Sequence, residues 1–239
     1  LNDDIALNLT LQQIEAEPDK YIPIGKTKPE YVVAEYNEDG TELIVRKNGE
    51  NSDGKMMDWE LYGFDSIFCG KPIEKITVKK GVTTIGDSAF VELHKLKTVV
   101  LSDTVELIGA QAFFDCNKMT QITFSNNLKT IGDEAFAYCE SLPDITFPAS
   151  LESIGIASFY RCNSFKNITI PDNVTTIGEA AFYYCRELTS LILPNNITNI
   201  GDDAFANCSQ ELVLFINNND YLIEFAKSPT TNNLYPYPF

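Results

Sequence analysis

The sequence has little positive charge. Its 239 residues include 18 lysines and arginines against 34 aspartates and glutamates, which gives a formal net charge of −16 and a pI near 4.4. A nucleic-acid-binding surface needs basic side chains that replace the counterions of the phosphates, and basic segments are also what anionic membranes attract. We therefore expect neither kind of partner. The acidity favours solubility and identifies no ligand.

Histidine is almost absent, because His94 is the only one. No serine or cysteine constellation lies near it in the sequence, so nucleophilic catalysis of the kind that pairs histidine with a nucleophile is not expected. Histidine-rich metal sites are excluded on the same ground. We predict that His94 is an ordinary surface residue.

Long hydrophobic runs are also missing. No apolar stretch approaches the ~18 residues that a membrane-spanning helix requires, so we expect no membrane insertion of this segment. The hydrophobic fraction of 44% and the mean hydropathy of −0.12 are typical of a globular protein. The sequence begins at Leu1 without a methionine or a signal peptide, which predicts a mature or trimmed chain.

What the sequence does contain is a 23-residue repeat, with six copies in residues 76–213. A fixed period between 20 and 29 residues, carried by leucine and isoleucine, is typical of a leucine-rich-repeat solenoid. No unit can bury its own apolar face, so neighbouring units must stack. Six isoleucine–glycine pairs keep the period: Ile85-Gly86, Ile108-Gly109, Ile131-Gly132, Ile154-Gly155, Ile177-Gly178 and Ile200-Gly201. Six phenylalanines keep it too: Phe90, Phe113, Phe136, Phe159, Phe182 and Phe205.

Each unit divides into three segments. The first alternates in the manner of a strand, so Leu191 and Leu193 point inward and Ile192 outward, and stacked copies form a parallel β-sheet on the concave face. The second, as at 174–178, is a short extended run that ends in glycine, where we expect either a positive φ or a close stacking contact. The third, as at 87–92, is predicted to be a helical or 3-10 turn with acidic residues at its start.

Residues 1–52 precede the repeats and are predicted to form an N-terminal cap or a small appended region. A helix over 3–16 is expected, with Asp3 or Asp4 as its cap, although an alternation of apolar residues there also permits a strand. Segments 31–36 and 41–46 flank a glycine-ending loop and predict a β-hairpin.

Atypical units are expected at both ends of a solenoid. We interpret residues 53–75 as a degenerate first unit, in which Phe68 falls one residue late. Residues 214–239 are predicted to be a C-terminal cap with a tyrosine- and proline-rich tail. Because proline cannot donate to a β-ladder, we expect the tail at 235–239 to lie across the last unit and not to continue the sheet.

The frame ITIPDNVTTIGEAAFYYC in the fifth unit closely resembles the BspA-type, or Treponema pallidum-type, leucine-rich repeat. The resemblance covers 76–213 and departs locally: Leu93 replaces a cysteine, Ser102 and Ser125 replace prolines, and Ser158 replaces an alanine. It implies a secreted or surface-attached protein, chiefly of host-associated bacteria, in a family whose members with a role are mostly adhesins or binding proteins. It carries over no catalytic residue, and it implies an extracellular or cell-surface location.

Five of the six cysteines keep the repeat period. Stacked neighbours have parallel Cβ vectors, which is poor disulfide geometry, and no Cys-x-x-Cys pair suggests zinc. We predict a ladder of buried free thiols, with Cys69 off the ladder. The members of the ladder are Cys116, Cys139, Cys162, Cys185 and Cys208.

Carboxylates at 87, 133–134, 179 and 202–203 form a repeating stripe. General acid–base catalysis needs two carboxylates in unlike environments, whereas a repeating surface gives like environments, so we interpret the stripe as a solvated face. A weak calcium site there lacks any loop signature. We expect no cofactor and no metal.

The outward strand positions are the best candidates for ligand binding, since they vary between units. Threonine also suits exposed strands without any ligand, but exposed apolar residues at Ile192 and Phe215 favour a contact surface, unless the tail covers them. The candidate residues are Thr77, Val100, Thr123, Thr146, Thr169, Ile192 and Phe215.

These observations favour a non-enzymatic binding or adhesion module that recognises a host or matrix protein or a glycan through its concave sheet. The alternative is a structural spacer or scaffold that displays another domain at the cell surface. A binding module predicts a non-uniform patch on the sheet, a spacer predicts a uniform polar face, and an enzyme would need a cleft with convergent polar groups, expected against residues 1–52.

Overall fold

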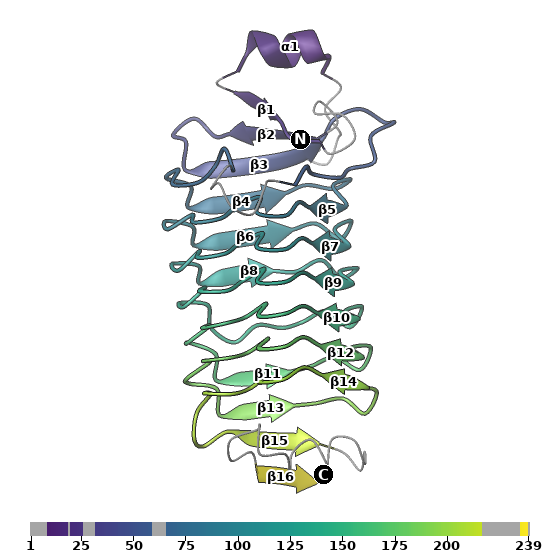
Figure 1. Cartoon of the computed structure of the whole chain (residues 1–239). Helices are drawn as coiled ribbons and strands as arrows, with labels where there is room; N and C mark the ends of the chain where they lie inside the picture. The colour runs from purple at the N-terminus through teal and green to yellow at the C-terminus, as the bar shows by residue number, and fades with distance from the viewer. Residues whose placement is uncertain (1–8, 19, 26–31, 59–65, 217–234, 239) are drawn as a thin grey trace.

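The structure is a computed structural model that describes residues 9–18, 20–25, 32–58, 66–216 and 235–238. Figure 1 shows a tower of stacked coils, each occupied by one repeat, with the helix and a hairpin at one end and the C-terminal strand at the other. The predicted leucine-rich-repeat solenoid is confirmed. Each coil has three sides: a side that contributes to a first sheet in every unit but the fourth, a two-residue strand in a second sheet, and a turn.

The first sheet is made of the longer strands and is divided into two parts. Six strands in the order β1-β2-β3-β4-β6-β8 form one part, and four in the order β11-β13-β15-β16 form the other. The strands of the first part are β1 (Tyr21–Pro23), β2 (Val32–Tyr36), β3 (Glu42–Lys47), β4 (Lys75–Val78), β6 (Thr98–Leu101) and β8 (Gln121–Thr123). Those of the second part are β11 (Asn167–Thr169), β13 (Ser190–Ile192), β15 (Val213–Ile216) and β16 (Tyr235–Pro238).

The second sheet contains one strand from every unit and is continuous. Its pairs are parallel and in register, for example Thr130 with Ser153 and Ser153 with Thr176. The isoleucine of each strand is buried, and the glycine follows it. The strands are β5 (Thr84–Ile85), β7 (Leu107–Ile108), β9 (Thr130–Ile131), β10 (Ser153–Ile154), β12 (Thr176–Ile177) and β14 (Asn199–Ile200).

The repeated glycines are explained by close stacking. None of the six has a positive φ. A Cβ added to Gly132 would lie 2.7 Å from the backbone nitrogen of Ala110 and from the carbonyl carbon of Gly109, which is closer than real Cβ atoms approach. The backbones of successive coils therefore touch at this point, and only glycine fits between them.

The third segment of each unit forms hydrogen-bonded turns with no helix in the described units. Two residues per turn have left-handed backbone angles, such as Ser88 (φ 53°) and Glu92 (φ 54°). These residues cannot continue a right-handed helix, and their N–H groups donate instead to the next coil, as Glu92 does to the Phe114 carbonyl over 2.8 Å. The turn side is therefore held by bonds between units.

A stack of phenylalanine rings forms the centre of the core. Phe113 lies 5.3 Å from Phe136, and Phe136 lies 5.3 Å from Phe159, with the ring planes within 9° of parallel in both pairs. All three side chains are fully buried. Phe68 extends the stack at 5.6 Å from Phe90, even though it falls one residue out of step with the repeat.

The N-terminal region continues the first sheet. β2 and β3 form the predicted antiparallel hairpin, and β3 then pairs in parallel with β4, so that Ile44 lies beside Thr77. Helix α1 (Leu11–Ala16) is shorter than predicted: residues 9 and 10 are not helical, and Thr10 caps it in a capping box with Gln13. Asp3 and Asp4 lie outside the described residues.

The prediction for the tail is wrong. Strand β16 pairs in parallel with β15 along its whole length and so extends the sheet. Pro236 and Pro238 are two residues apart, and alternate N–H groups of a strand point to opposite sides. Both prolines therefore lack a donor on the same side, which a strand at the edge of a sheet tolerates.

Candidate ligand-binding face

The seven predicted candidates occupy equivalent positions along the outer face of the first sheet, the predicted concave face, and all of them except Thr146 lie in its strands. Register places Thr77 beside Val100 and Val100 beside Thr123 in the first part, and Thr169 beside Ile192 and Ile192 beside Phe215 in the second. Most of their chain neighbours are buried, although Ile122 and Ile145 are half-buried, whereas the candidates themselves are exposed or half-buried. The inward and outward assignment from sequence is confirmed, but whether the row binds a ligand stays a prediction.

The row is interrupted where the fourth unit should supply a strand. Residues 144–147 form no strand in the structure, although they occupy the position of β8 and β11 in the neighbouring coils. Among the described residues, no main-chain hydrogen bond joins Ile145, Thr146 or Phe147 to either strand. The first sheet is therefore split at this unit, while the second sheet is intact.

Proline at position 143 accounts for the missing pairing. In other units the residue at this point donates its N–H to the preceding coil: Lys97 donates to the Glu74 carbonyl over 2.8 Å and Thr120 to the Lys97 carbonyl over 2.9 Å. Pro143 has no N–H to give to Thr120. The ladder that would position the fourth strand therefore cannot start.

Asp144 takes over the bonds that the next coil would otherwise make to position 143. Its Oδ1 accepts the backbone N–H of Lys166 over 2.6 Å and that of Asn167 over 2.8 Å, and its Oδ2 accepts the Asn167 side-chain amide over 2.9 Å. Burial raises the pKa of Asp144, but these donors outweigh it, so the pKa lies below its ordinary value. A side chain has replaced a carbonyl as the link between coils.

Bulky side chains also fill the core at this point. The inward positions of Val78 and Leu101 are occupied by Phe124 and Phe147 in the third and fourth units. The two rings lie 6.0 Å apart, and Phe147 meets Phe159 of the central stack edge to face at 5.6 Å. Two consecutive aromatic rings therefore fill positions that valine and leucine fill in the first two units, and an aromatic ring needs more room.

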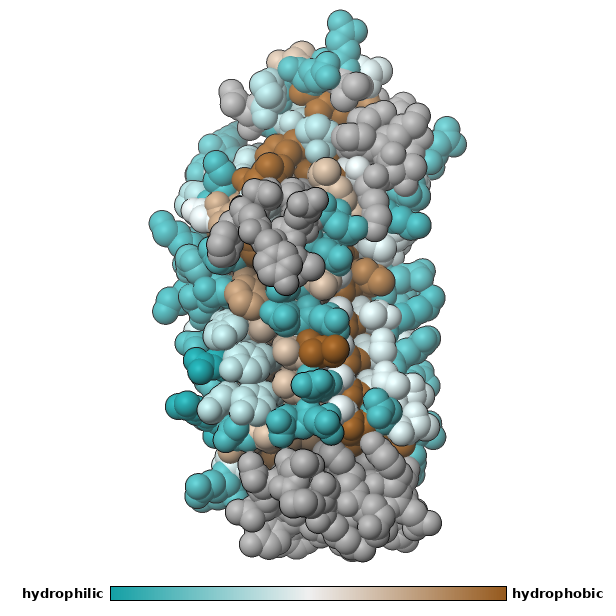
Figure 2. Space-filling model, in the orientation of Figure 1, coloured by the Kyte–Doolittle hydropathy of each residue, from teal (hydrophilic) through white to brown (hydrophobic). Residues whose placement is uncertain are grey.

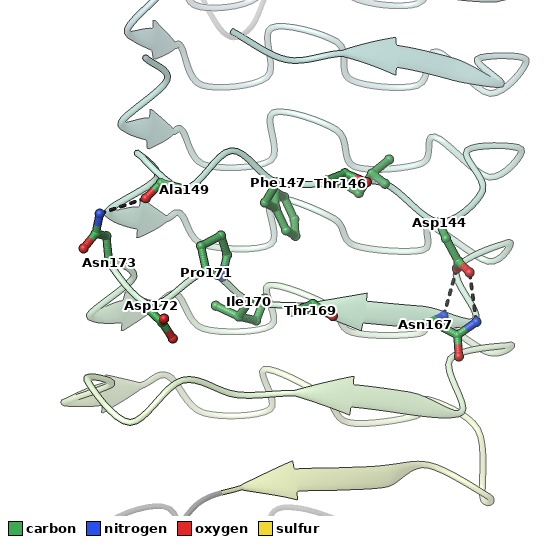
Figure 3. A pocket seen from close by; sticks show the side chains of 11 residues that line it. Asp144, Thr146, Phe147, Ala149, Asn167, Thr169, Ile170, Pro171, Asp172 and Asn173 are labelled. Atoms are coloured by element: carbon green, nitrogen blue, oxygen red, sulfur yellow. Dashed lines mark hydrogen bonds between the residues drawn. The ribbon is translucent and has the colours of Figure 1, made fainter. Parts of the chain in front are cut away.

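Two hollows flank the interrupted segment. The larger has a volume of about 760 Å³ and lies between residues 144–149 and 167–173. Figure 3 shows its lining: Asp144 and Asn167 are hydrogen-bonded at one end, Thr146 and Thr169 lie along it, and at the other end Asn173 donates to the Ala149 carbonyl. Phe147 and Pro171 contribute apolar surface between these ends.

The smaller hollow, of about 300 Å³, lies on the other side of the segment between 120–124 and 142–146. Thr123 and Thr146 line it. Three of the seven candidates, Thr123, Thr146 and Thr169, are therefore brought to hollows, whereas Thr77, Val100, Ile192 and Phe215 line neither of these two. A concave site with few polar groups and some apolar wall is a typical ligand site.

The acidic stripe is partly structural. Asp87 accepts the backbone N–H of Ala110 over 2.7 Å, and Asp133 accepts that of Ile156 over 2.7 Å. These carboxylates lie on the turn side and link adjacent coils. Among the described residues, no group of three or more histidine, cysteine or carboxylate side chains converges as a metal site would require.

The cysteines are free thiols in the predicted ladder. Each Sγ donates to a carbonyl of the coil before it, as Cys139 does to Phe113 over 3.3 Å and Cys162 to Phe136 over 3.3 Å. Burial raises the pKa of Cys116 to about 12. Cys69 is half-buried and donates instead to the Glu92 carboxylate over 3.7 Å. Such thiols are poor nucleophiles, because the thiolate is the reactive form.

Sequence reasoning missed the split sheet and its cause. The signal was available, because aligning the units shows Pro143 where the other units need an N–H. It also missed a group of tyrosines and arginines on the turn side, which lie within four residues after the periodic phenylalanines. Both features lie in the third to fifth units.

The part of the chain that the structure describes contains no helix with the length and apolar character needed to cross a membrane. The model of the BspA-type leucine-rich repeat region, with six copies, matches residues 64–164 and 107–228. No curated protein sequence matches the chain.

Solved structures of bacterial leucine-rich-repeat proteins are similar to this one. A leucine-rich cell surface protein of Faecalibacterium prausnitzii has 28% identity and a TM-score of 0.60, over 77% of this chain and 52% of its own. This chain thus spans about half the length of that protein. A leucine-rich-repeat protein of Treponema pallidum has 24% identity and a TM-score of 0.50, over 89% and 98%. With the family model matching well over half of its residues, the chain belongs to the BspA-type leucine-rich-repeat family.

Proposed function

We propose that this chain is a non-enzymatic binding module that recognises a protein or glycan ligand through the outer face of the first sheet, at the surface of a bacterial cell or outside it. The interruption at residues 144–147 carries the proposal. It turns an otherwise even strand face into two hollows, lined by side chains from three successive units.

The chemistry of the larger hollow supports recognition more than catalysis. Two carboxylates line it, Asp144 and Asp172, and Figure 3 shows them toward opposite ends. Asp144 is already held by three N–H donors and has a lowered pKa, which suits a fixed structural charge and not a proton shuttle. Thr146 and Thr169 offer hydroxyls, and Phe147 and Pro171 offer apolar contact. This mixture of a few polar groups and an apolar wall gives orientation and affinity to a bound ligand.

A location at the cell surface is supported by the similarity to the F. prausnitzii protein, whose description is a leucine-rich cell surface protein. The alternative of a pure spacer predicts a uniform polar strand face. The two hollows, and the change from threonine at 169 to Ile192 and Phe215 along the row, argue for binding.

The test is a screen of the purified chain against immobilised glycans and extracellular-matrix proteins, repeated with two variants. Thr146→Arg and Thr169→Arg place a long charged side chain at the hollows, and each should weaken a bound ligand by about tenfold or more, since a blocked pocket loses well over 1.4 kcal/mol. Thr175→Arg is the matched control, because Thr175 is an exposed threonine next to β12 on the second sheet.

Equal weakening by Thr175→Arg, in protein that remains folded by circular dichroism, would remove the site from the first sheet. No binding to any member of the panel, even with the chain displayed in many copies on beads, would favour the spacer.

A further inference from the structure

A compact group of aromatic and basic side chains lies on the turn side, away from the two sheets. We call it the tyrosine–arginine cluster. It comes from the third, fourth and fifth units, and all its members except Arg186 lie at one of the two positions that follow a periodic phenylalanine. Its members are Tyr138, Tyr160, Arg161, Tyr183, Tyr184 and Arg186.

The members contact one another directly. The ring centroids of Tyr160 and Tyr183 lie 5.6 Å apart with their planes 3° from parallel, and those of Tyr183 and Tyr184 lie 4.6 Å apart edge to face. The Arg161 guanidinium lies 5.2–5.7 Å from the rings of Tyr138, Tyr160 and Tyr184. The ring faces are thus occupied by one another and by the guanidinium, which leaves ring edges and hydroxyls for a ligand.

The backbone conformation that places three of these side chains is unfavourable for their residue types. Tyr138, Arg161 and Tyr184 have φ values of 63°, 59° and 61°, in the left-handed region that bulky residues rarely adopt. In the other units this position holds Glu92, Asp115 and Asn207, of which aspartate and asparagine are better tolerated there. A tyrosine or arginine occupies this conformation in three consecutive units against its local preference, and such departures are expected where a surface serves a function.

The positive charges in the cluster are not matched by carboxylates. The chain has three arginines; Arg46 pairs with Glu35 over 2.6 Å, whereas neither Arg161 nor Arg186 has an ion pair with a carboxylate among the described residues. This is unexpected in a chain with 34 acidic residues. Arg161 Nε is also buried with no hydrogen-bond partner in the described structure, and buried polar atoms are normally paired.

We propose that the tyrosine–arginine cluster is a second binding site, which takes the carboxylate of an acidic sugar residue in a glycan. The planar guanidinium fork of arginine matches a carboxylate in two hydrogen bonds. The tyrosine hydroxyls can donate to and accept from sugar hydroxyls.

The surroundings of the cluster select this ligand class. A protein partner would bring an apolar anchor that needs a pocket, but the ring faces here are already covered. A polyanion is disfavoured by the net charge of −16 and by the carboxylate of Glu134, which lies near the cluster. Burial and the neighbouring Tyr160 are the larger causes that raise the pKa of Tyr138, and the charge of Glu134 adds to them. A sugar with one carboxylate on an otherwise neutral, hydroxylated ring needs no apolar pocket and brings only one negative charge. Figure 2 shows that hydrophilic side chains cover most of the described part of the visible face, with hydrophobic side chains in a narrow column in its lower half and in a separate group above.

The experiment follows the arginine Nε–H signals of the ¹⁵N-labelled chain by NMR, which are simple to assign because there are only three arginines. The probes are 3′-sialyllactose and digalacturonic acid, with lactose as the neutral sugar and N-acetylglutamate amide as the acidic peptide analogue. At least one acidic sugar should shift the signals of Arg161 and Arg186 saturably and leave that of Arg46 unchanged. Lactose and the glutamate derivative should bind at least about tenfold more weakly.

Variants make the test specific to the cluster. Arg161→Gln should weaken the acidic sugar by about tenfold or more, the usual effect of losing a charge-assisted hydrogen bond, and Arg161→Lys should weaken it less. Arg186→Gln, at an exposed residue, tests the site without risk to the fold, and Lys118→Gln, an exposed cation on a preceding turn, is the matched control. Equal shifts with lactose, an equal affinity for the glutamate derivative, no response to either acidic sugar, or equal loss in Lys118→Gln would each overturn the proposal.

Discussion

The carboxylate of Asp144 is bound to Asn167 of the following coil by two hydrogen bonds, one from the backbone N–H over 2.8 Å and one from the side-chain amide over 2.9 Å. In the neighbouring coils a backbone carbonyl makes this link, as the Lys166 carbonyl does when it accepts the N–H of Ser190 over 3.0 Å. The side chain is longer than the carbonyl it replaces. It can therefore bond to the next coil even though residues 144–147 form no strand in the first sheet.

Asp144→Ala should reduce the free energy of unfolding by about 1 kcal/mol, since the carboxylate is mostly exposed although it accepts three N–H groups. The lowered pKa sets the pH dependence: the contribution is complete above the ordinary value of 3.8 and is lost as the pH falls through the folded-state pKa. Urea unfolding of both proteins at pH 7 and pH 2.5 measures this. A difference that is unchanged at pH 2.5 would mean that the charge plays no part.

Phe136→Ala should cost about 3–5 kcal/mol, because the ring is fully buried and stacked between Phe113 and Phe159. Phe114→Ala, at a half-buried ring on the turn side, should cost about 1–2 kcal/mol. Denaturant unfolding of both variants gives the comparison. Equal losses would show that the central stack is not the main source of stability.

Much of this fold could be predicted from sequence because stacked units superpose equivalent residues. The period of the isoleucine–glycine pairs gave the register of the second sheet, where Ile131, Ile154 and Ile177 lie side by side. The alternation around Thr169 and Ile192 gave the outward row in the same way. Regular sequence translates directly into regular contacts.

The interruption of the first sheet could not be predicted by the same reasoning, because that reasoning uses the residues that all units share and overlooks a residue that differs in one unit. Its cause is one missing N–H at Pro143, and its size depends on how Asp144 and Phe147 rearrange around that loss. Helix α1 shows a similar limit: its capping box, Thr10 with Gln13, is visible in the sequence, but apolar spacing placed the start of the helix too early. The tail shows that the effect of proline depends on whether a strand is central or at an edge.

Stability should fall as the pH rises above about 9. Burial raises the pKa of Cys116 to about 12 and that of Cys139 well above its ordinary 9.0, so these thiols stay protonated in the folded state while the unfolded chain ionises. Each such thiol should reduce the free energy of unfolding by about 1.4 kcal/mol at pH 10, and by almost nothing at pH 7.

The measurement is the urea midpoint between pH 7 and pH 10, in a reducing buffer. Cys139→Ala should make the loss of stability between pH 7 and pH 10 smaller by the contribution of one thiol, whatever the substitution does to stability at pH 7. If the urea midpoint falls with pH as steeply in the variant as in the unchanged protein, groups other than this thiol cause the loss of stability. Thiol titration of the denatured, unreduced chain should find the six cysteines free, as in the structure.

Ser158→Ala should stabilise the protein. Ser158 is fully buried, its hydroxyl has no hydrogen-bond partner among the described residues, and alanine occupies the same place in the adjacent units, as at Ala135 and Ala181. Removing a buried, unpaired hydroxyl should add about 1 kcal/mol to the free energy of unfolding, which for a chain of this size raises Tm by about 2–4 °C.

Ser125→Ala is the matched control: Ser125 is equally buried, but its Oγ accepts the N–H of Asn127 over 3.1 Å, so its loss should lower Tm. Thermal unfolding by calorimetry should therefore move the two variants in opposite directions. A lower Tm for Ser158→Ala would mean that its hydroxyl is paired in solution.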